Sequence, residues 1–181
     1  MKKALNLTPL IIFVFIIFVG ALSVYQKAQK NSLNDNLKNR KIVPLPNFYL
    51  QDLYNIGSSF SKKDILESST KISLINIFAS WCTTCHVEHQ ALLELANDKD
   101  FKVNIYGIAW NDVSDKAHEY LEKEGNPYVQ TSIDNRGVLS DLLGVNGVPE
   151  TLIVNNKGKI LYRHKGNLDY DIINYVKKLS K

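Results

Sequence analysis

The sequence is poor in the residues on which very small or extended proteins depend: its 181 residues include two cysteines, nine glycines and five prolines. Two cysteines cannot build a disulfide framework, so a disulfide-dense miniprotein is excluded and the pair needs another explanation. The composition, with 45% hydrophobic and 22% charged residues, also excludes a collagen-like repeat and a wholly disordered chain. What is present suits a globular protein, since about 140 residues can bury a real core.

The positive charge lies in the N-terminal part of the chain. The net charge of +4 comes from 22 basic and 18 acidic residues, and residues 1–41 hold seven of the basic residues and one of the acidic ones. The remaining 15 basic and 17 acidic residues leave residues 42–181 with a net charge of −2. Nucleic-acid binding needs clustered lysine and arginine on the folded surface, so we expect no nucleic-acid partner.

A long apolar run follows the first two lysines. No charged side chain occurs between Ala4 and Gln26, and this span is about as long as the roughly 20 residues that cross a bilayer. We expect residues 1–25 to form one transmembrane helix that anchors the protein; the alternative is a signal peptide cleaved after Ala21. The charges on the two sides do not determine the orientation, but both alternatives usually place the rest of the chain outside the cytoplasm.

The rest of the chain divides at two prolines. Residues 26–43 are polar and are predicted to be a linker, and Pro44 and Pro46 mark the entry to a folded domain over residues 44–181. Strand and helix patterns alternate through this domain, which indicates an α/β sandwich around a mixed sheet. The predicted strands are Phe48–Leu53, Lys71–Phe78, Val103–Trp110, Tyr128–Ile133, Thr151–Val154 and Lys159–His164, and the predicted helical segments are Ser61–Glu67, 83–97, Ser114–Glu124, Val138–Leu143 and 168–180.

The motif that carries chemistry is Trp81-Cys82-Thr83-Thr84-Cys85, which follows a predicted buried strand and begins a helix. Two cysteines at this spacing can form a disulfide with little rearrangement. Cys82 lies near unpaired backbone N–H groups and the positive end of the helix dipole, which favour its thiolate. The thiolate attacks a disulfide, and Cys85 then resolves the mixed disulfide. The motif predicts thiol–disulfide exchange by a redox-active disulfide, with no further cofactor.

Residues 45–178 resemble the thioredoxin-like fold, a three-layer sandwich with a central mixed sheet. Phe78–Cys85 looks like the strand-to-helix active site of that fold, and Gly147–Glu150 looks like the loop whose proline is cis and faces the dithiol. An X–Pro bond adopts the cis form at little cost, so Pro149 suits this role. The resemblance implies that the backbone of Val148 pairs with an extended peptide partner.

Four segments follow one another along the chain: Cys82–His89, Gly125–Tyr128, Gly144–Thr151 and Tyr162–Leu168. Together they are similar to the membrane-anchored thioredoxin-like reductases of cytochrome c maturation, the CcmG or DsbE family. This resemblance implies a single-pass protein of the inner membrane whose domain faces the periplasm. It would keep the haem-attachment cysteines of apocytochrome c reduced, directly or through a haem-ligation partner, and would draw electrons from a membrane donor of the DsbD or CcdA type. The alternative is a general extracytoplasmic reductase, or an oxidase, with another client.

The chain departs from thioredoxin itself in the strand before the dithiol. Thioredoxin carries a buried aspartate six residues before its first cysteine, and this chain has Asn76 there. Asparagine cannot accept a proton at neutral pH, so another group has to assist Cys85. Glu88 lies three residues after Cys85 on a neighbouring helix face, where partial burial would raise its pKa. We predict that Glu88 exchanges a proton with the resolving thiol; the alternative is a solvated helix acid.

The same residues also fit a haem protein. Cys82–His86 satisfies the c-type haem attachment signature, with His86 as one axial ligand. The only methionine is Met1, so the opposite ligand would have to be His118 or His164, which belong to other elements. Haem also leaves Trp81 unexplained, so we treat it as the less favoured reading.

A zinc site is a third interpretation of the motif. Cys82, Cys85, His86 and His89 crowd on one or two helical turns, whereas zinc ligand pairs usually come from separate segments. A purely structural disulfide rarely spans three residues at the start of a helix. We therefore expect no metal, and we expect His86 to be a polar or charged neighbour of the thiolate.

Contacts with a partner are predicted around the dithiol. Trp81 is expected to shield the cysteines and contact partners, although it is equally explained as an aromatic residue at the rim. Val148 and Pro149 are predicted to form the peptide groove. Glu150 is predicted to contact the partner, the alternative being a bond to a nearby backbone group, and Arg163 is expected to be solvated at a sheet edge.

Overall fold

The computed structural model describes residues 8–38 and 42–180, and the chain forms two compact units, Met1–Arg40 and Lys41–Lys181. The first unit contains helix α1 (Thr8–Lys38), which continues through most of the predicted polar linker. Part of the predicted anchor, residues 1–7, lies outside the described residues. Within the two described ranges, no helix has both the length and the apolar character needed to cross a membrane.

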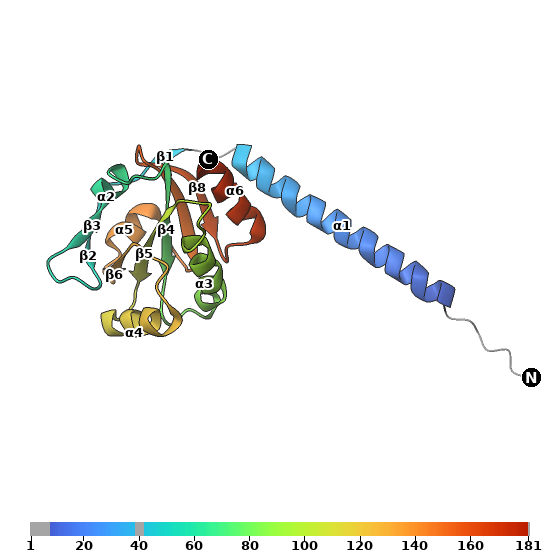
Figure 1. Ribbon diagram of the computed structural model, residues 1–181, viewed down its shortest axis with the longest axis horizontal. Helices are drawn as coiled ribbons and strands as arrows, with labels where there is room; N and C mark the ends of the chain where they lie inside the picture. Colours follow the sequence, from blue (N-terminus) through green and yellow to red (C-terminus); the bar gives the residue numbers. More distant parts are fainter. Residues whose placement is uncertain (1–7, 39–41, 181) are drawn as a thin grey trace, which may run out of the picture. The chain divides into compact units, whose positions relative to one another are not determined.

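The second unit is an α/β domain built around one sheet (Figure 1). In the part of the chain that is described, eight strands form this sheet in the order β1-β8-β7-β4-β5-β6-β2-β3. The strands are β1 (Val43–Pro44), β2 (Tyr49–Asp52), β3 (Ser59–Ser61), β4 (Ile72–Phe78), β5 (Asn104–Trp110), β6 (Gln130–Asp134), β7 (Glu150–Asn155) and β8 (Lys159–Lys165). The helices are α2 (Lys62–Leu66), α3 (Thr83–Ala96), α4 (Ser114–Glu124), α5 (Val138–Leu143) and α6 (Tyr170–Ser180).

Strand β4 is the buried centre of the sheet. All of its residues are buried, and it pairs in parallel with β5 and antiparallel with β7. A strand whose two faces are both covered by helices has an almost continuous apolar sequence, which is why this segment was recognisable as a buried strand. The predicted α/β sandwich around a mixed sheet is confirmed.

The two faces of β4 meet different helices, because successive side chains of a strand point to opposite faces. Ile75 packs into an apolar cluster that includes Ile65 of α2 and Leu139 of α5. Asn76 points to the other face, where its side chain bonds Glu88 of α3. Helix α6 lies near the end of α3, since Lys177 of α6 forms an ion pair with Asp98, two residues beyond α3 (Figure 1). The dithiol helix therefore starts at the end of the most buried strand and lies against the opposite face from α2 and α5.

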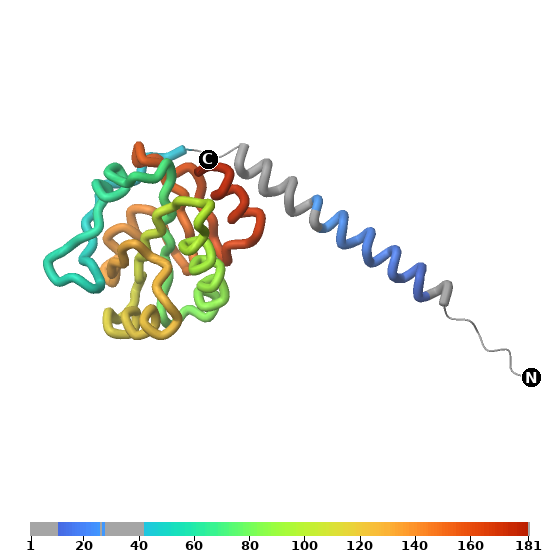
Figure 2. Tube along the Cα trace, in the orientation of Figure 1, coloured from blue at the N-terminus to red at the C-terminus, as the bar shows by residue number. Residues whose placement is uncertain are grey.

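The structure also contains two edge strands that the sequence pattern does not predict. β1 has two residues and pairs with β8, and β3 has three residues and pairs with β2. Such segments are too short for an alternating pattern to show, since this signal needs about four residues or more. They become strands because each segment runs beside a longer strand and pairs with it. The teal hairpin of β2 and β3 is visible in the trace of Figure 2.

Candidate active site

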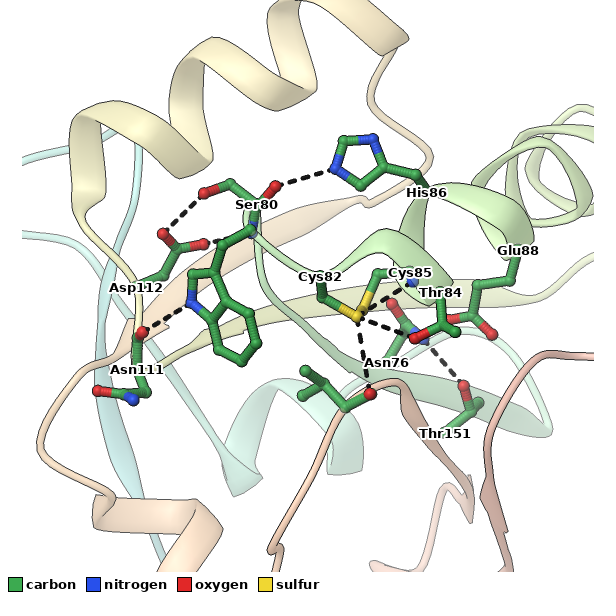
Figure 3. Close-up of a disulfide and its surroundings, with 12 residues drawn as sticks. Asn76, Ser80, Cys82, Thr84, Cys85, His86, Glu88, Asn111, Asp112 and Thr151 are labelled. Carbon is green, nitrogen blue, oxygen red and sulfur yellow. Dashed lines mark hydrogen bonds between the residues drawn. A yellow bond between two sulfur atoms is a disulfide. The ribbon is translucent and has the colours of Figure 1, made fainter.

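Cys82 and Cys85 form a disulfide at the first turn of α3, with their Cα atoms 5.3 Å apart (Figure 3). Cys82 is the N-cap of the helix, and its Sγ accepts a hydrogen bond of 3.1 Å from the backbone N–H of Cys85. The Thr84 hydroxyl lies 3.3 Å from the same sulfur. After reduction, these donors and the positive end of the helix favour a thiolate at Cys82.

The loop between α5 and β7 faces this sulfur. The Val148–Pro149 peptide bond is cis, as predicted, and the Val148 carbonyl oxygen lies 3.6 Å from Cys82 Sγ. A groove of about 440 Å³ lies beside the disulfide. It is lined by Thr84, Asn146, Gly147, Val148, Pro149, Lys165, Gly166 and Asn167. An extended peptide in this groove would lie next to both the sulfur and the backbone of Val148.

Glu88 is buried behind the dithiol, with only 2% of its surface exposed. Its Oε1 accepts a hydrogen bond of 2.8 Å from Asn76 Nδ2, and its Oε2 accepts one of 3.0 Å from the backbone N–H of Leu168. Burial raises the pKa of Glu88 from 4.5 to about 7, although these two hydrogen bonds oppose the shift. The alternative of a solvated helix acid is therefore wrong, and Glu88 can hold or release a proton near neutral pH.

Asn76 holds Glu88 in a fully buried polar network. Its Nδ2 also donates to Thr151 Oγ1 at 2.9 Å, and its Oδ1 accepts a hydrogen bond of 2.7 Å from the Tyr128 hydroxyl. Figure 3 shows Asn76, Thr151 and Glu88 together on one side of the disulfide. Tyr128 and Thr151 were not predicted to belong to the site. Both fall within the segments that carry the family resemblance, which was the only signal available for them.

Gly107 makes room for this network. A Cβ atom at Gly107 would lie 2.5 Å from Cδ2 of the Tyr128 ring. We therefore expect Gly107→Ala to displace Tyr128 and to lower the free energy of unfolding by about 1–3 kcal/mol, the usual cost of overpacking. Chemical denaturation would measure this loss. Gly147→Ala is the control, because its Cβ would meet nothing within 4 Å; equal stability of the two variants would contradict tight packing at Tyr128.

Trp81 is held at the surface by the loop that follows β5. Its indole N–H donates to the Asn111 carbonyl at 3.0 Å, while 57% of the residue stays exposed. Asp112, which is buried, accepts hydrogen bonds from the backbone N–H and the hydroxyl of Ser80. The two contacts fix the turn between β4 and α3 from one side. The exposed ring is open to a partner, whereas the roles of Ser80 and Asp112 could not be read from the sequence.

His86 lies on the same side, away from the groove. Its Nε2 lies 2.9 Å from the Ser80 carbonyl oxygen, and its ring centroid lies 4.5 Å from that of Tyr120. His89, on the next turn, bonds the Gly125 carbonyl, and burial lowers its pKa. Among the described residues, no three His, Cys, Asp or Glu side chains gather as a metal site would need. His86 is thus a polar neighbour of the turn before Cys82.

Glu150 does not reach the groove. Its side chain is 1% exposed and forms an ion pair with Arg163, so it cannot touch a docked partner in this conformation. The expectation that Arg163 is solvated is also wrong, because its guanidinium donates to the carbonyls of Leu143 and Gly144. Sequence spacing places Glu150 next to Pro149, but only the pairing of β7 with β8 decides that its side chain meets Arg163.

Comparison with known proteins agrees with this site. The sequence matches the Redoxin family over residues 28–179. The thiol:disulfide interchange protein DsbE of Escherichia coli (strain K12) is 37% identical over 172 residues, which cover 93% of this chain and 89% of that protein. The DsbE of Vibrio cholerae is 35% identical over 173 residues, with coverage of 93% and 89%.

Solved structures support the fold. The thioredoxin domain of a thiol-disulfide oxidoreductase from Bacteroides vulgatus superposes with a TM-score of 0.64 at 23% identity, covering 77% of this chain and 96% of that one. This likeness establishes the thioredoxin-like arrangement. Together with the sequence matches and the Cys82–Cys85 pair, it shows that the chain belongs to the Redoxin family and is a thiol-disulfide oxidoreductase related to the DsbE proteins.

Proposed function

We propose that this protein reduces disulfides during cytochrome c biogenesis, acting on the haem-attachment cysteines of apocytochrome c or on a haem-ligation partner. The observation that carries the proposal is the 37% identity to DsbE along 93% of the chain. The proposal is further supported by the buried Glu88 behind the dithiol, an acid on α3 in a chain that has Asn76 at the strand position of the thioredoxin aspartate. A general extracytoplasmic reductase with other clients is the second candidate, since fold alone does not identify clients.

The reaction begins with the protein in its dithiol form. The Cys82 thiolate attacks one sulfur of the client disulfide, and the other client sulfur leaves as a thiolate that takes up a proton. Cys85 then loses its proton and attacks Cys82 Sγ, which releases the second client thiol and forms the Cys82–Cys85 disulfide. Two electrons pass to the client. We propose that Glu88, which is buried three residues after Cys85 on the same helix and has a pKa of about 7, accepts the Cys85 proton.

The proposal includes a membrane anchor and a periplasmic location. Apolar side chains of α1 such as Ile11, Phe15 and Phe18 are more than half exposed, which is unfavourable in water and suits a lipid environment. No charged side chain interrupts the sequence between Ala4 and Gln26. An anchored domain outside the cytoplasm needs electrons from across the membrane, so a membrane donor of the DsbD or CcdA type would regenerate the dithiol.

Trapping tests the client directly. In a Cys85→Ser variant, the mixed disulfide at Cys82 has no resolving thiol, so we expect it to accumulate with the client and to appear as a larger species on non-reducing gels. Mass spectrometry of that species identifies the client. A Cys82→Ser variant should trap nothing. Trapping of unrelated exported proteins, with no apocytochrome c or haem-ligation protein among them, would favour the general reductase.

Deletion in the parent cell gives an independent check. We expect loss of mature c-type cytochromes, restored by the wild-type chain and not by Cys82→Ser.

The midpoint potential of the Cys82–Cys85 couple separates a reductant from an oxidant. A value of about −270 mV or somewhat above supports reduction, and a value of about −120 mV contradicts it. A Soret band on the purified protein would instead indicate bound haem.

A further inference from the structure

The groove beside the disulfide carries a single charged side chain. Of its eight lining residues, Lys165 alone is ionisable and the others are polar, apolar or glycine. Lys165 is exposed, and its Nζ lies at the limit of hydrogen bonding, 3.5 Å from Asn146 Oδ1. Within residues 42–180, no acidic side chain forms an ion pair with it. The groove therefore presents an uncompensated positive charge.

The pairing of β7 with β8 explains why Lys165 is left without an acid. Glu150 is its register partner across the two strands, so an ion pair between them would be expected from position alone. Glu150 instead pairs with Arg163, which lies two residues earlier on the same face of β8. Because Arg163 compensates the buried carboxylate, the charge of Lys165 remains available to a molecule in the groove.

The wall that carries Lys165 is fixed in place. The Gly166 N–H donates to the Pro149 carbonyl at 2.9 Å, and the Leu168 N–H donates to Glu88 at 3.0 Å. His164 Nε2 lies 2.7 Å from the Asn167 carbonyl oxygen. These contacts hold residues 165–168 against the cis-proline loop and the dithiol helix. The backbone that carries Lys165 is thus held at a defined position beside the cis-proline loop, which is what a specificity contact requires.

We propose that Lys165 selects client segments that carry a carboxylate side chain close to the cysteine attacked by Cys82. The Val148 carbonyl is 3.6 Å from Cys82 Sγ. A client cysteine joined to that sulfur therefore lies next to Val148, and the client residues on either side of that cysteine lie in the groove. An aspartate or glutamate there gains the attraction of Lys165, and a lysine or arginine is repelled. This inference rests on thiol–disulfide exchange at Cys82 and concerns which clients react fastest.

Kinetics with matched peptides test the proposal. The probes are blocked synthetic peptides closed by a Cys-Ala-Ala-Cys disulfide, with glutamate, glutamine or lysine at each flanking position in turn. Each is mixed with the full-length reduced protein, and the rate of peptide reduction in this single turnover gives a second-order rate constant. At low salt we expect one glutamate position to react about fivefold faster than its glutamine counterpart, the upper range for an exposed ion pair. The preference should shrink at about 0.5 M salt.

Variants locate the source of the preference. Lys165→Gln should abolish it, and Lys165→Glu should reverse it in favour of the lysine peptide; each rate is divided by the rate of the glutamine peptide measured with the same variant. The matched control is Lys157→Glu, which makes the same charge change at the exposed turn before β8. Lys165 is at the other end of that strand, which is roughly 20 Å long. It should retain the preference.

The outcomes separate this proposal from the reaction on which it rests. A preference that survives Lys165→Glu, or that Lys157→Glu reverses equally, would overturn the role of Lys165 in favour of overall charge. Equal rates for all three peptides with the wild-type protein would overturn it as well. If no peptide is reduced at all, the failure lies in exchange at Cys82, which a standard small disulfide such as oxidised glutathione would reveal.

Discussion

Replacing Glu88 with glutamine is expected to make the oxidised protein more stable at pH 8 and to leave its stability below pH 4.5 nearly unchanged. The pKa of Glu88 rises from 4.5 to about 7 in the folded protein, chiefly through burial. The folded state therefore binds more protons than the unfolded state between these values. The contribution of protonated Glu88 to the free energy of unfolding is fully present below pH 4.5 and is lost as the pH rises through about 7.

The size of this loss in the free energy of unfolding follows from the shift in the pKa of Glu88. Each pKa unit corresponds to about 1.4 kcal/mol, so the ionisation of Glu88 costs on the order of 3 kcal/mol above pH 7. Glutamine resembles the protonated acid in shape and charge and has no such ionisation. The gain in Glu88→Gln is reduced by lost hydrogen bonds, since an amide has one oxygen to accept from both Asn76 and Leu168 where the carboxylate has two.

Denaturation curves between about pH 4 and 8 measure the effect, with Glu94→Gln as the control. Glu94 lies on the same helix and is exposed, so its neutral variant should follow the wild-type pH dependence. Parallel curves for wild type and Glu88→Gln would contradict the raised pKa.

Glu88→Gln should also slow the resolution of the mixed disulfide by Cys85, most of all at neutral pH and above, where the wild-type carboxylate is ready to accept a proton. The decay of the mixed disulfide, followed by stopped-flow mixing, measures this rate.

Arg163→Met is expected to cost about 3 kcal/mol of stability or more, because it leaves the carboxylate of Glu150 buried without a compensating charge. It also removes the donors to the carbonyls of Leu143 and Gly144. Those carbonyls end α5 and begin the loop that leads to the cis proline. The variant should therefore both unfold more easily and bind disulfide peptides less well.

A double variant separates the two effects. Adding Glu150→Leu removes the buried charge, so Arg163→Met with Glu150→Leu should regain most of the lost stability, as replacements of buried ion pairs by apolar residues often do. The loop remains without its arginine, so KM for a disulfide peptide should stay raised. Arg136→Met, at an exposed position of the loop after β6, is the control. A double variant as unstable as the single one would refute the compensating role of Arg163.

The sequence by itself was sufficient for the elements whose signal is local. The apolar run at Lys71–Phe78 specifies a strand that is buried on both faces, and Cys82–Cys85 at the start of a helix specifies the dithiol. The bounds predicted for Ser114–Glu124 and Val138–Leu143 are those observed. In each case neighbours in the chain are also neighbours in space, so a pattern along the sequence carries the information.

The tertiary structure decided everything that depends on residues far apart in the chain. Spacing put Glu88 near Cys85, but its burial and raised pKa come from β4 and from Leu168, 80 positions away. Glu150 was predicted to contact a partner, and the neighbouring strand instead supplies Arg163, which leaves Lys165 as the charge in the groove. Electrostatics at this site depends on which side chains share a desolvated space, and only strand pairing and helix packing determine that.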